Sequence, residues 1–179
     1  SGQGQYQHAI VIFDKADGSI LRREPLNMLT GGASPLAFVR SGVRLSLIQY
    51  TGDEIQLFDL STGATSRLRG TTGKLQATAV ADDCCYVAEY TALASSTVTA
   101  IRLSDGRELW RQDLQRPCNA LLAHREVVAA AFSGALVSPG TIVALDPASG
   151  RERWTYTAGN RATDLCAVMN GRLLIRTRQ

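Results

Sequence analysis

The 179-residue sequence predicts an all-β fold made of repeated four-stranded sheets, and three observations carry this prediction. A turn pattern recurs at a nearly constant spacing. Strand-like apolar alternation flanks each copy, and no segment combines a helical apolar period with helix caps. An apolar fraction of 45% supplies enough side chains for a core. The longest apolar stretch, residues 127–137, is shorter than the ~20 residues of a transmembrane helix, so no such segment is predicted in this chain.

Four glycines mark the repeat, at positions 18, 63, 106 and 150, so successive copies are separated by 45, 43 and 44 residues. Each glycine ends a cluster of Asp, Ser and Thr that follows a β-branched run. Such a cluster predicts a hairpin turn in which the glycine adopts a positive φ and the polar side chains bond the turn amides. The four hairpins begin in the segments 10–18, 55–63, 98–106 and 142–150.

Two further strands are predicted before each of the last three hairpins, and two more after the last one. Four-stranded units of about 40–45 residues are typical of propeller blades. The sequence therefore predicts a β-propeller of four-stranded blades, with four blade equivalents per chain. The added strands are 36–40 with 43–50, 75–80 with 84–90, 119–123 with 127–132, and 164–169 with 172–177. The repeats fall at about 8–35, 36–74, 75–118 and 119–163, with a half-repeat at 164–179.

The two ends of the chain each supply half a blade. With strands labelled A to D from the axis outward, the chain starts with C and D and finishes with A and B, so the halves add up to one composite blade. Pairing them removes an open sheet edge. Three arrangements stay open: a four-bladed ring, half of an eight-bladed ring completed by a second copy, or a piece of a longer propeller. Residues 1–7 are expected to be a tag scar or a disordered start.

Two copies of the repeat carry a more specific motif. Residues 144–154 (Ala-Leu-Asp-Pro-Ala-Ser-Gly-Arg-Glu-Arg-Trp) and 101–110 (Ile-Arg-Leu-Ser-Asp-Gly-Arg-Glu-Leu-Trp) resemble the repeat of PQQ-like (pyrroloquinoline-quinone-type) β-propellers. That family's pattern is Ala-x-Asp-x-x-Thr/Ser-Gly-x-x-x-Trp, and its Trp packs onto the neighbouring blade. Arg22 and Arg67 stand in place of the Trp in the first two copies, and Arg102 replaces the Asp of the third.

The resemblance implies a fold more than a function, because one fold hosts many activities. The family includes quinone-dependent alcohol dehydrogenases, an outer-membrane assembly lipoprotein, and sensor and scaffold domains. Its members favour an extracytoplasmic location for this chain: periplasmic, secreted or lumenal.

The four cysteines fall into two pairs, and for each pair we consider whether it forms a disulfide. Cys84 and Cys85 are adjacent, as are the cysteines of the vicinal disulfide that stacks on the cofactor in the quinone dehydrogenases. The favoured interpretation is structural, with one Cys in the core and the other facing out. Cys118 and Cys166 occupy nearly equivalent repeat positions; a disulfide near the axis is conceivable, but two buried free thiols are favoured. The cysteine spacings do not fit a zinc site.

The sequence gives little evidence for other catalytic or ligand-binding sites. His8 and His124 are isolated, and His124 is expected in a solvated turn. Residues 70–75 (Gly-Thr-Thr-Gly-Lys-Leu) resemble a phosphate loop but lack its first glycine and its magnesium-binding hydroxyl, so they are predicted to connect two blades. No cofactor or metal site is predicted. The net charge of +3, with acids and bases well mixed, argues against a nucleic-acid partner.

The predicted site is the face that carries the D–A and B–C loops, where basic residues from successive blades converge. These could bind an acidic peptide or an anion; scattered surface arginine is the alternative. The leading functional hypothesis is a non-catalytic scaffold module, favoured over an enzyme, that binds a protein partner or a second copy of itself as a homodimer. The alternatives are part of a quinone-dependent alcohol dehydrogenase, or an extracytoplasmic sensor domain of a membrane receptor or kinase. The predicted binding residues are Arg69, Lys74, Tyr90, Arg116 and Arg161.

Overall fold

The computed structural model describes most of the chain, and every regular element in that part is a strand. It describes residues 8–13, 16–26, 37–41, 44–50, 54–92, 95–132, 140–157, 163–169 and 172–177. None of these segments is a helix, so none is a long apolar helix able to cross a membrane. The all-β prediction is confirmed; the predicted start at 1–7 lies outside the described residues. Contacts divide the chain into two compact units, Ser1–Ser34 and Pro35–Gln179.

The first unit contains one antiparallel hairpin. Its strands are β1 (His8–Phe13) and β2 (Ile20–Leu26). Gly18 lies in the turn with φ 73°, and the Asp17 carboxylate accepts a hydrogen bond from the Ser19 amide at 2.8 Å. The first copy of the repeat is therefore the hairpin that the sequence predicts.

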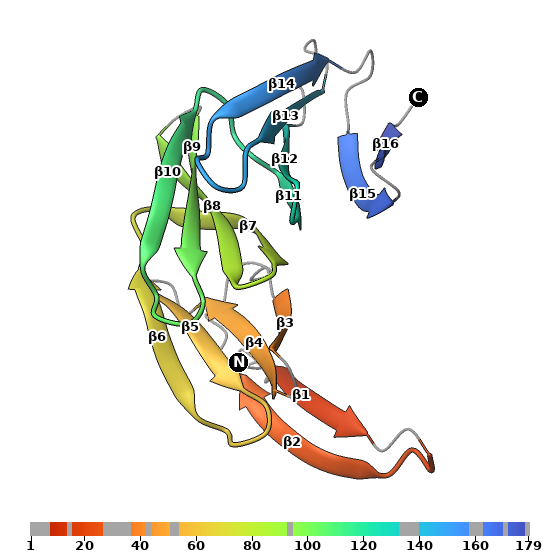
Figure 1. Cartoon of the computed structure of the whole chain (residues 1–179). Coiled ribbons are helices and arrows are strands. Elements are labelled where there is room, and N and C mark those ends of the chain that lie inside the picture. The colour runs from red at the N-terminus through yellow and green to blue at the C-terminus, as the bar shows by residue number, and fades with distance from the viewer. Residues whose placement is uncertain are drawn as a thin grey trace, which may run out of the picture. The chain divides into compact units, whose positions relative to one another are not determined.

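Within its described residues, the second unit contains three four-stranded antiparallel sheets and one two-stranded sheet (Figure 1). Each four-stranded sheet follows chain order, as a propeller blade does. We call these sheets the β3–β6, β7–β10 and β11–β14 blades. Their strands are β3 (Ala37–Ser41), β4 (Arg44–Tyr50), β5 (Glu54–Asp59), β6 (Thr65–Gly70), β7 (Lys74–Ala81), β8 (Cys84–Ala92), β9 (Ser95–Arg102), β10 (Glu108–Leu114), β11 (Ala120–His124), β12 (Val127–Phe132), β13 (Thr141–Leu145) and β14 (Glu152–Thr157). The two-stranded sheet pairs β15 (Thr163–Met169) with β16 (Arg172–Thr177).

The first strand of each blade lies on the inner side of the arrangement. β7 contacts both β3 and β11, and β11 in turn contacts β15 (Figure 1). Middle strands such as β13 are buried along their whole length, whereas the outer strand β14 is exposed along its whole length. This gradient arises because neighbouring blades cover both faces of a middle strand, which accounts for its continuous apolar sequence.

The repeated turn is built by one aspartate and one glycine. In the second copy, the Asp59 carboxylate accepts the amides of Ser61 at 2.7 Å and Thr62 at 3.0 Å, and the Gly63 amide donates to the Asp59 carbonyl at 2.8 Å. Asp146 organises the fourth copy in the same way. The glycines have φ of 71–74° in all four copies, a region that costs a side chain energy.

The third copy keeps this turn although Arg102 replaces the aspartate. The Gly106 amide still donates to the Arg102 carbonyl at 2.8 Å. The missing carboxylate is replaced by Asp105, which accepts the Arg107 amide at 3.0 Å and pairs with the Arg102 guanidinium at 3.2 Å. The backbone geometry therefore depends on the glycine, while the position of the acid can move.

The glycine turns also form the contacts between blades. A Cβ added to Gly150 would lie 2.5 Å from the Trp110 ring, and one added to Gly106 would lie 2.6 Å from the Leu68 carbonyl oxygen. The Trp110 indole donates a hydrogen bond to the Pro147 carbonyl at 2.7 Å. The turn of one blade thus packs on the outer strand of the preceding blade, as the PQQ-like resemblance implies for Trp110.

Trp110 also connects two sheets through the core. Its ring centroid lies 5.8 Å from that of Tyr86, and both rings belong to an apolar cluster shared by the β7–β10 and β11–β14 blades. Ala88 and Val98 join this cluster from one blade, and Leu145 joins it from the other. Burying these side chains together holds the two sheets in place.

We expect Trp110→Ala to lower the free energy of unfolding by about 3–5 kcal/mol, because it leaves a cavity over Gly150 and an unpaired Pro147 carbonyl. Leu109→Ala, on the neighbouring and exposed position of the same strand, is the control and should cost under about 1 kcal/mol. Urea unfolding followed by circular dichroism measures both. Equal losses for the two variants would contradict the proposed role of the indole contact.

The Asp146 turn should make stability depend on pH. Hydrogen bonds from Arg153 and then Ser149 lower the pKa of Asp146 from 3.8 to about 2. Because the folded-state pKa is depressed, the ionised carboxylate stabilises the fold above pH ~4, and that stability disappears as the pH falls through 2. Asp146→Asn should therefore lower the thermal midpoint at pH 7, and the difference from the parent chain should shrink between pH 4 and pH 2. An unchanged difference at pH 2 would contradict this assignment.

Candidate functional site

The strand pairing brings the predicted site residues to one end of each blade. Lys74 lies opposite Tyr90 at the junction of β7 and β8, and Ser96 lies opposite Leu114 at the matching end of β9 and β10. We call this end the loop face; it comprises the D–A connections 71–73 and 115–119 and the strand ends that flank them. Arg69, Lys74 and Tyr90 gather at one blade junction, and Arg116 stands at the next. Arg161 lies outside the described residues.

Arg69 is held by two carboxylates of the following blade. Its guanidinium lies 3.1 Å from Glu89 and 3.3 Å from Glu108, and its Nε donates to the Gly70 carbonyl at 2.8 Å. The Arg69 side chain is 11% exposed and the Glu89 side chain 0% exposed. A buried carboxylate is costly unless it is paired, so this contact is first of all a crosslink between blades. Three of the five N–H donors of Arg69 are used inside the chain.

Glu89 is the centre of this network and was not among the predicted site residues. Besides Arg69, it accepts the Thr72 amide at 2.8 Å and the Thr72 hydroxyl at 3.1 Å. The available signal is that Glu89 is the one acidic residue in the otherwise uncharged strand β8. Thr72 belongs to the segment that resembles a phosphate loop. Because its amide is bound to Glu89, it is not available to a phosphate group. The segment instead connects β6 to β7, which is the connection between blades that the sequence predicts.

Lys74 is the member of the site that projects from the protein. It is exposed, and its ammonium has no ion-pair partner within the described part of the chain. Beneath it the backbone is tightly packed, because a Cβ added to Gly73 would clash with the Tyr90 carbonyl oxygen. Tyr90 is half-buried beside it. Gly73 thus lets the connection pass close to β8 and sets the start of β7, from which Lys74 extends.

Arg116 borders a groove between the β7–β10 and β11–β14 blades. Its Nη1 donates to the Thr141 hydroxyl at 2.6 Å, so Arg116 also joins one blade to the next. The groove has a volume of about 340 Å³ and combines apolar side chains with amide, carboxylate and guanidinium groups. The Asp113 carboxylate in its wall accepts the Thr97 hydroxyl at 2.7 Å. The groove is lined by Gln112, Asp113, Leu114, Gln115, Arg116, Phe132, Thr141, Val143, Glu152 and Thr155.

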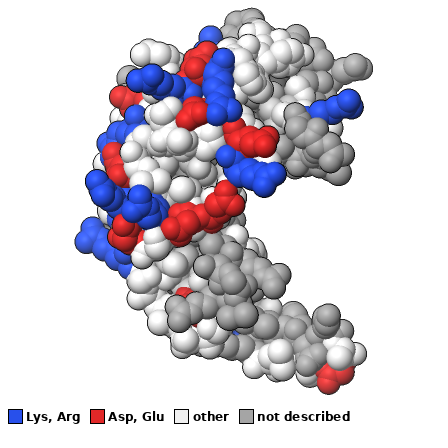
Figure 2. Space-filling model, viewed as in Figure 1, with Lys and Arg blue, Asp and Glu red and all other residues white. Residues whose placement is uncertain are grey.

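Charges of both signs are interleaved on the face of the molecule that Figure 2 shows. Figure 2 shows Lys and Arg next to Asp and Glu, with no large area of one sign among the coloured side chains. Pairs such as Arg111 with Glu108, at 3.0 Å, explain part of this mixing. Exposed pairs of this kind contribute little stability.

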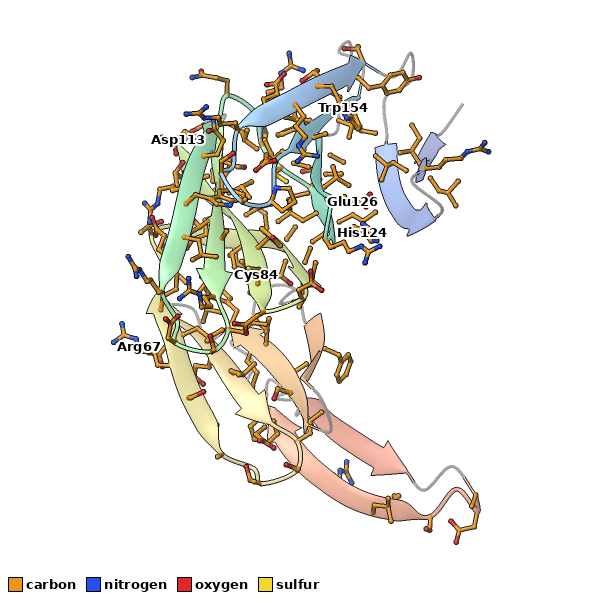
Figure 3. All side chains as sticks on the ribbon, viewed as in Figure 1. Arg67, Cys84, Asp113, His124, Glu126 and Trp154 are labelled. Atoms are coloured by element: carbon orange, nitrogen blue, oxygen red, sulfur yellow. The ribbon has the colours of Figure 1, made fainter. Side chains whose placement is uncertain are left out.

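The adjacent cysteines lie on opposite faces of β8. Cys85 is buried in a cluster with Ile48 and Ile101, whereas Cys84 packs against the cluster that contains Tyr86 (Figure 3). Both are free thiols, so they do not form the vicinal disulfide of the quinone dehydrogenases. Burial raises the pKa of Cys85 to about 12 and also raises that of Cys84. Protonated thiols are poor nucleophiles. Cys84 is half-buried rather than facing out, which corrects that detail of the sequence interpretation.

The other candidate residues are structural in the described part of the chain. Cys118 is a free, fully buried thiol whose pKa burial raises to about 12. The side chains of Cys166 and His8 lie outside the described residues. His124 was expected in a solvated turn, but it is the half-buried last residue of strand β11, and its Nδ1 accepts the Glu126 amide at 3.4 Å (Figure 3). Within the described residues, no group of three or more His, Cys, Asp or Glu side chains is arranged to hold a metal ion.

Comparison with known proteins supports the repeat. Residues 94–179 match the protein family described as outer membrane protein assembly factor BamB. The structure is similar to BamB from Moraxella catarrhalis, with 14% identity and a TM-score of 0.58 over 94% of this chain and 51% of that one. It is also similar to apo AztD from Citrobacter koseri, with 14% identity and a TM-score of 0.59 over 86% and 42% of the two chains. For the Dos1 propeller the identity is 12% and the TM-score 0.64, over 85% and 43%.

These likenesses confirm the resemblance to PQQ-like repeats and the propeller fold. At 12–14% identity, the structural matches establish the fold alone. No curated protein matches the sequence. The chain spans about half the length of the solved propellers to which it is similar.

We expect Glu89→Ala to lower the free energy of unfolding by about 3–5 kcal/mol, because it leaves the Arg69 guanidinium and the Thr72 amide without their buried partner. Glu108→Ala is the matched control, since Glu108 binds the same guanidinium but is 43% exposed. It should cost under about 1 kcal/mol. Chemical unfolding measures both, and a Glu108 variant that loses as much as the Glu89 variant would refute the ranking.

Proposed function

Because residues 94–179 match the BamB family, we propose that this chain is a non-catalytic propeller module that binds a protein partner at its loop face. The observation that carries the proposal is the groove beside Arg116. Its polar rim and its apolar side chains, Leu114, Phe132 and Val143, suit an extended peptide segment. The proposed ligand is a segment with an acidic side chain for Arg116 and an apolar side chain for the floor of the groove.

The charges of the loop face support an acidic segment. The Arg116 side chain keeps donors beyond the one that binds Thr141, and the Lys74 ammonium has no ion-pair partner within the described residues. Guanidinium groups bind carboxylates in two-pronged geometry. Arg69 contributes less to binding in this proposal, because Glu89 and Glu108 engage it. Arg161, the remaining predicted basic residue, lies outside the described residues and carries no part of this argument.

The adjacent cysteines no longer support the alternative function, part of a quinone-dependent alcohol dehydrogenase. Cys84 and Cys85, which carried it, are free thiols on opposite faces of one strand. The proposal also includes an extracytoplasmic location, supported by the outer-membrane protein named in the description of the matching family. Fractionation of the source cells tests that location, and recovery in the cytoplasm would refute it.

We expect a random decapeptide library selected on the intact protein to yield acidic peptides that contain an apolar residue. The double charge reversal Lys74→Glu with Arg116→Glu should weaken binding of such a peptide by about tenfold or more, since it replaces attraction with repulsion. Fluorescence anisotropy measures the affinity. Arg125→Glu, in the exposed turn between β11 and β12, is the matched control and should leave the affinity unchanged. Equal weakening by the control would place binding elsewhere.

A further inference from the structure

The internal repeat identifies which residues correspond to Arg69 and its partners at the next blade junction. At the first junction, between the β3–β6 and β7–β10 blades, the Arg69 guanidinium lies 3.1 Å from Glu89 and 3.3 Å from Glu108. At the second junction, between the β7–β10 and β11–β14 blades, there is a groove of about 340 Å³ beside Arg116. We call it the second-junction groove. Comparing equivalent positions shows why the two junctions differ.

Gln112 is the counterpart of Arg69 at the second junction. Each lies six residues after the turn glycine of its blade, and each pairs with the residue eight positions before that glycine: Arg69 with Ile55, and Gln112 with Val98. Both side chains also bind the carbonyl of the residue that follows them, at 2.8 Å from Arg69 Nε and at 3.2 Å from Gln112 Nε2. Gln112 is shorter and uncharged, so it brings no guanidinium to the second junction.

One of the two carboxylates is kept at the second junction, and the other is replaced. Glu152 corresponds to Glu108, since each begins the fourth strand of its blade two residues after the turn glycine. Phe132 corresponds to Glu89, since each pairs with the threonine nine positions before the turn glycine. All three counterparts line the second-junction groove. The groove therefore lies where the preceding junction holds an arginine side chain.

The groove combines a carboxylate that has no basic partner with an aromatic ring. Within the described residues Glu152 forms no ion pair; its Oε1 accepts the Thr155 hydroxyl at 2.7 Å, and a carboxylate can accept several further bonds. At the first junction the corresponding carboxylate, that of Glu108, binds the guanidinium groups of two arginines. Phe132, which is 3% exposed, replaces the second carboxylate, and guanidinium groups pack favourably on aromatic rings.

We propose that the second-junction groove binds an arginine side chain of a partner protein, in the place that corresponds to the Arg69 guanidinium at the first junction. Glu152 accepts hydrogen bonds from this guanidinium, and Phe132 packs against it. The inference rests on the proposed function and extends its ligand: the bound segment carries an arginine in addition to the acidic side chain for Arg116 and the apolar side chain. The carboxylate of Asp113, also in the groove wall, favours a cation there as well.

A double-mutant cycle between peptide and protein tests the assigned contact. Decapeptides selected on the intact protein should contain arginine, and replacing it with citrulline, its uncharged isostere, should weaken binding about fivefold or more in fluorescence anisotropy. In the Glu152→Gln variant the same replacement should have little effect, because the accepting carboxylate is gone. Glu126→Gln, in the exposed turn between β11 and β12, is the matched control and should keep the full citrulline effect.

The outcomes of this cycle separate the inference from the proposed function. A citrulline effect that is absent, or that is as large in the Glu152→Gln variant as in the parent chain, overturns the inference. Acidic peptides that bind without arginine, and that the double charge reversal Lys74→Glu with Arg116→Glu weakens, overturn the inference while supporting the proposed function. A library that yields no binding peptide refutes both.

Gln112→Arg provides a second test, because it introduces the arginine that the repeat has at the first junction. The new side chain should occupy the place of the peptide arginine and weaken binding of the arginine peptide about fivefold or more, while the citrulline peptide binds at least as well as before. Leu109→Arg, which adds the same charge to the same strand outside the groove, should leave both affinities unchanged. Undiminished binding of the arginine peptide by a Gln112→Arg variant with the circular dichroism of the parent chain would refute the proposal.

Discussion

The contact between the glycine turn of one blade and the outer strand of the preceding blade is the interaction on which the arrangement of the sheets depends. Gly150 is required there twice, once because its φ is 71° and once because a Cβ would enter the Trp110 ring. The indole also donates to the Pro147 carbonyl, so the contact is directional as well as apolar. At the earlier junction the Leu68 backbone takes the place of the indole against Gly106, which shows that close approach is the shared requirement.

Polar contacts at the other end of the blades also join each blade to the following one. Arg69 reaches Glu89, and Arg116 reaches Thr141; in each pair the partner belongs to the following blade. These two arginines therefore hold the loop face in position, and only their remaining N–H donors are available to a ligand. Lys74 differs, because its ammonium makes no such contact among the described residues. On the proposed binding face, Arg69 and Arg116 are therefore held by contacts within the protein. Fewer charged side chains are available to a ligand there than the composition indicates.

The sequence predicted the elements well because strands and turns follow from local pattern. The predicted 127–132 and 172–177 strands match β12 and β16, and the glycines at 18, 63, 106 and 150 all have the predicted positive φ. The site was predicted less completely. Glu89 was missed, since an acid within a strand is normally solvated, and only the approach of Arg69 from another blade explains its burial.

The repeat, the four-stranded blades and the turn chemistry follow from the amino-acid sequence, because each depends on residues within one blade. Tertiary structure alone decided which basic side chains are engaged, which faces of β8 receive Cys84 and Cys85, and that Trp110 is covered while Trp154 is exposed. The two tryptophans share one motif and one strand position. Trp110 is covered by the glycine turn of the following blade, and that contact joins residues far apart in the chain.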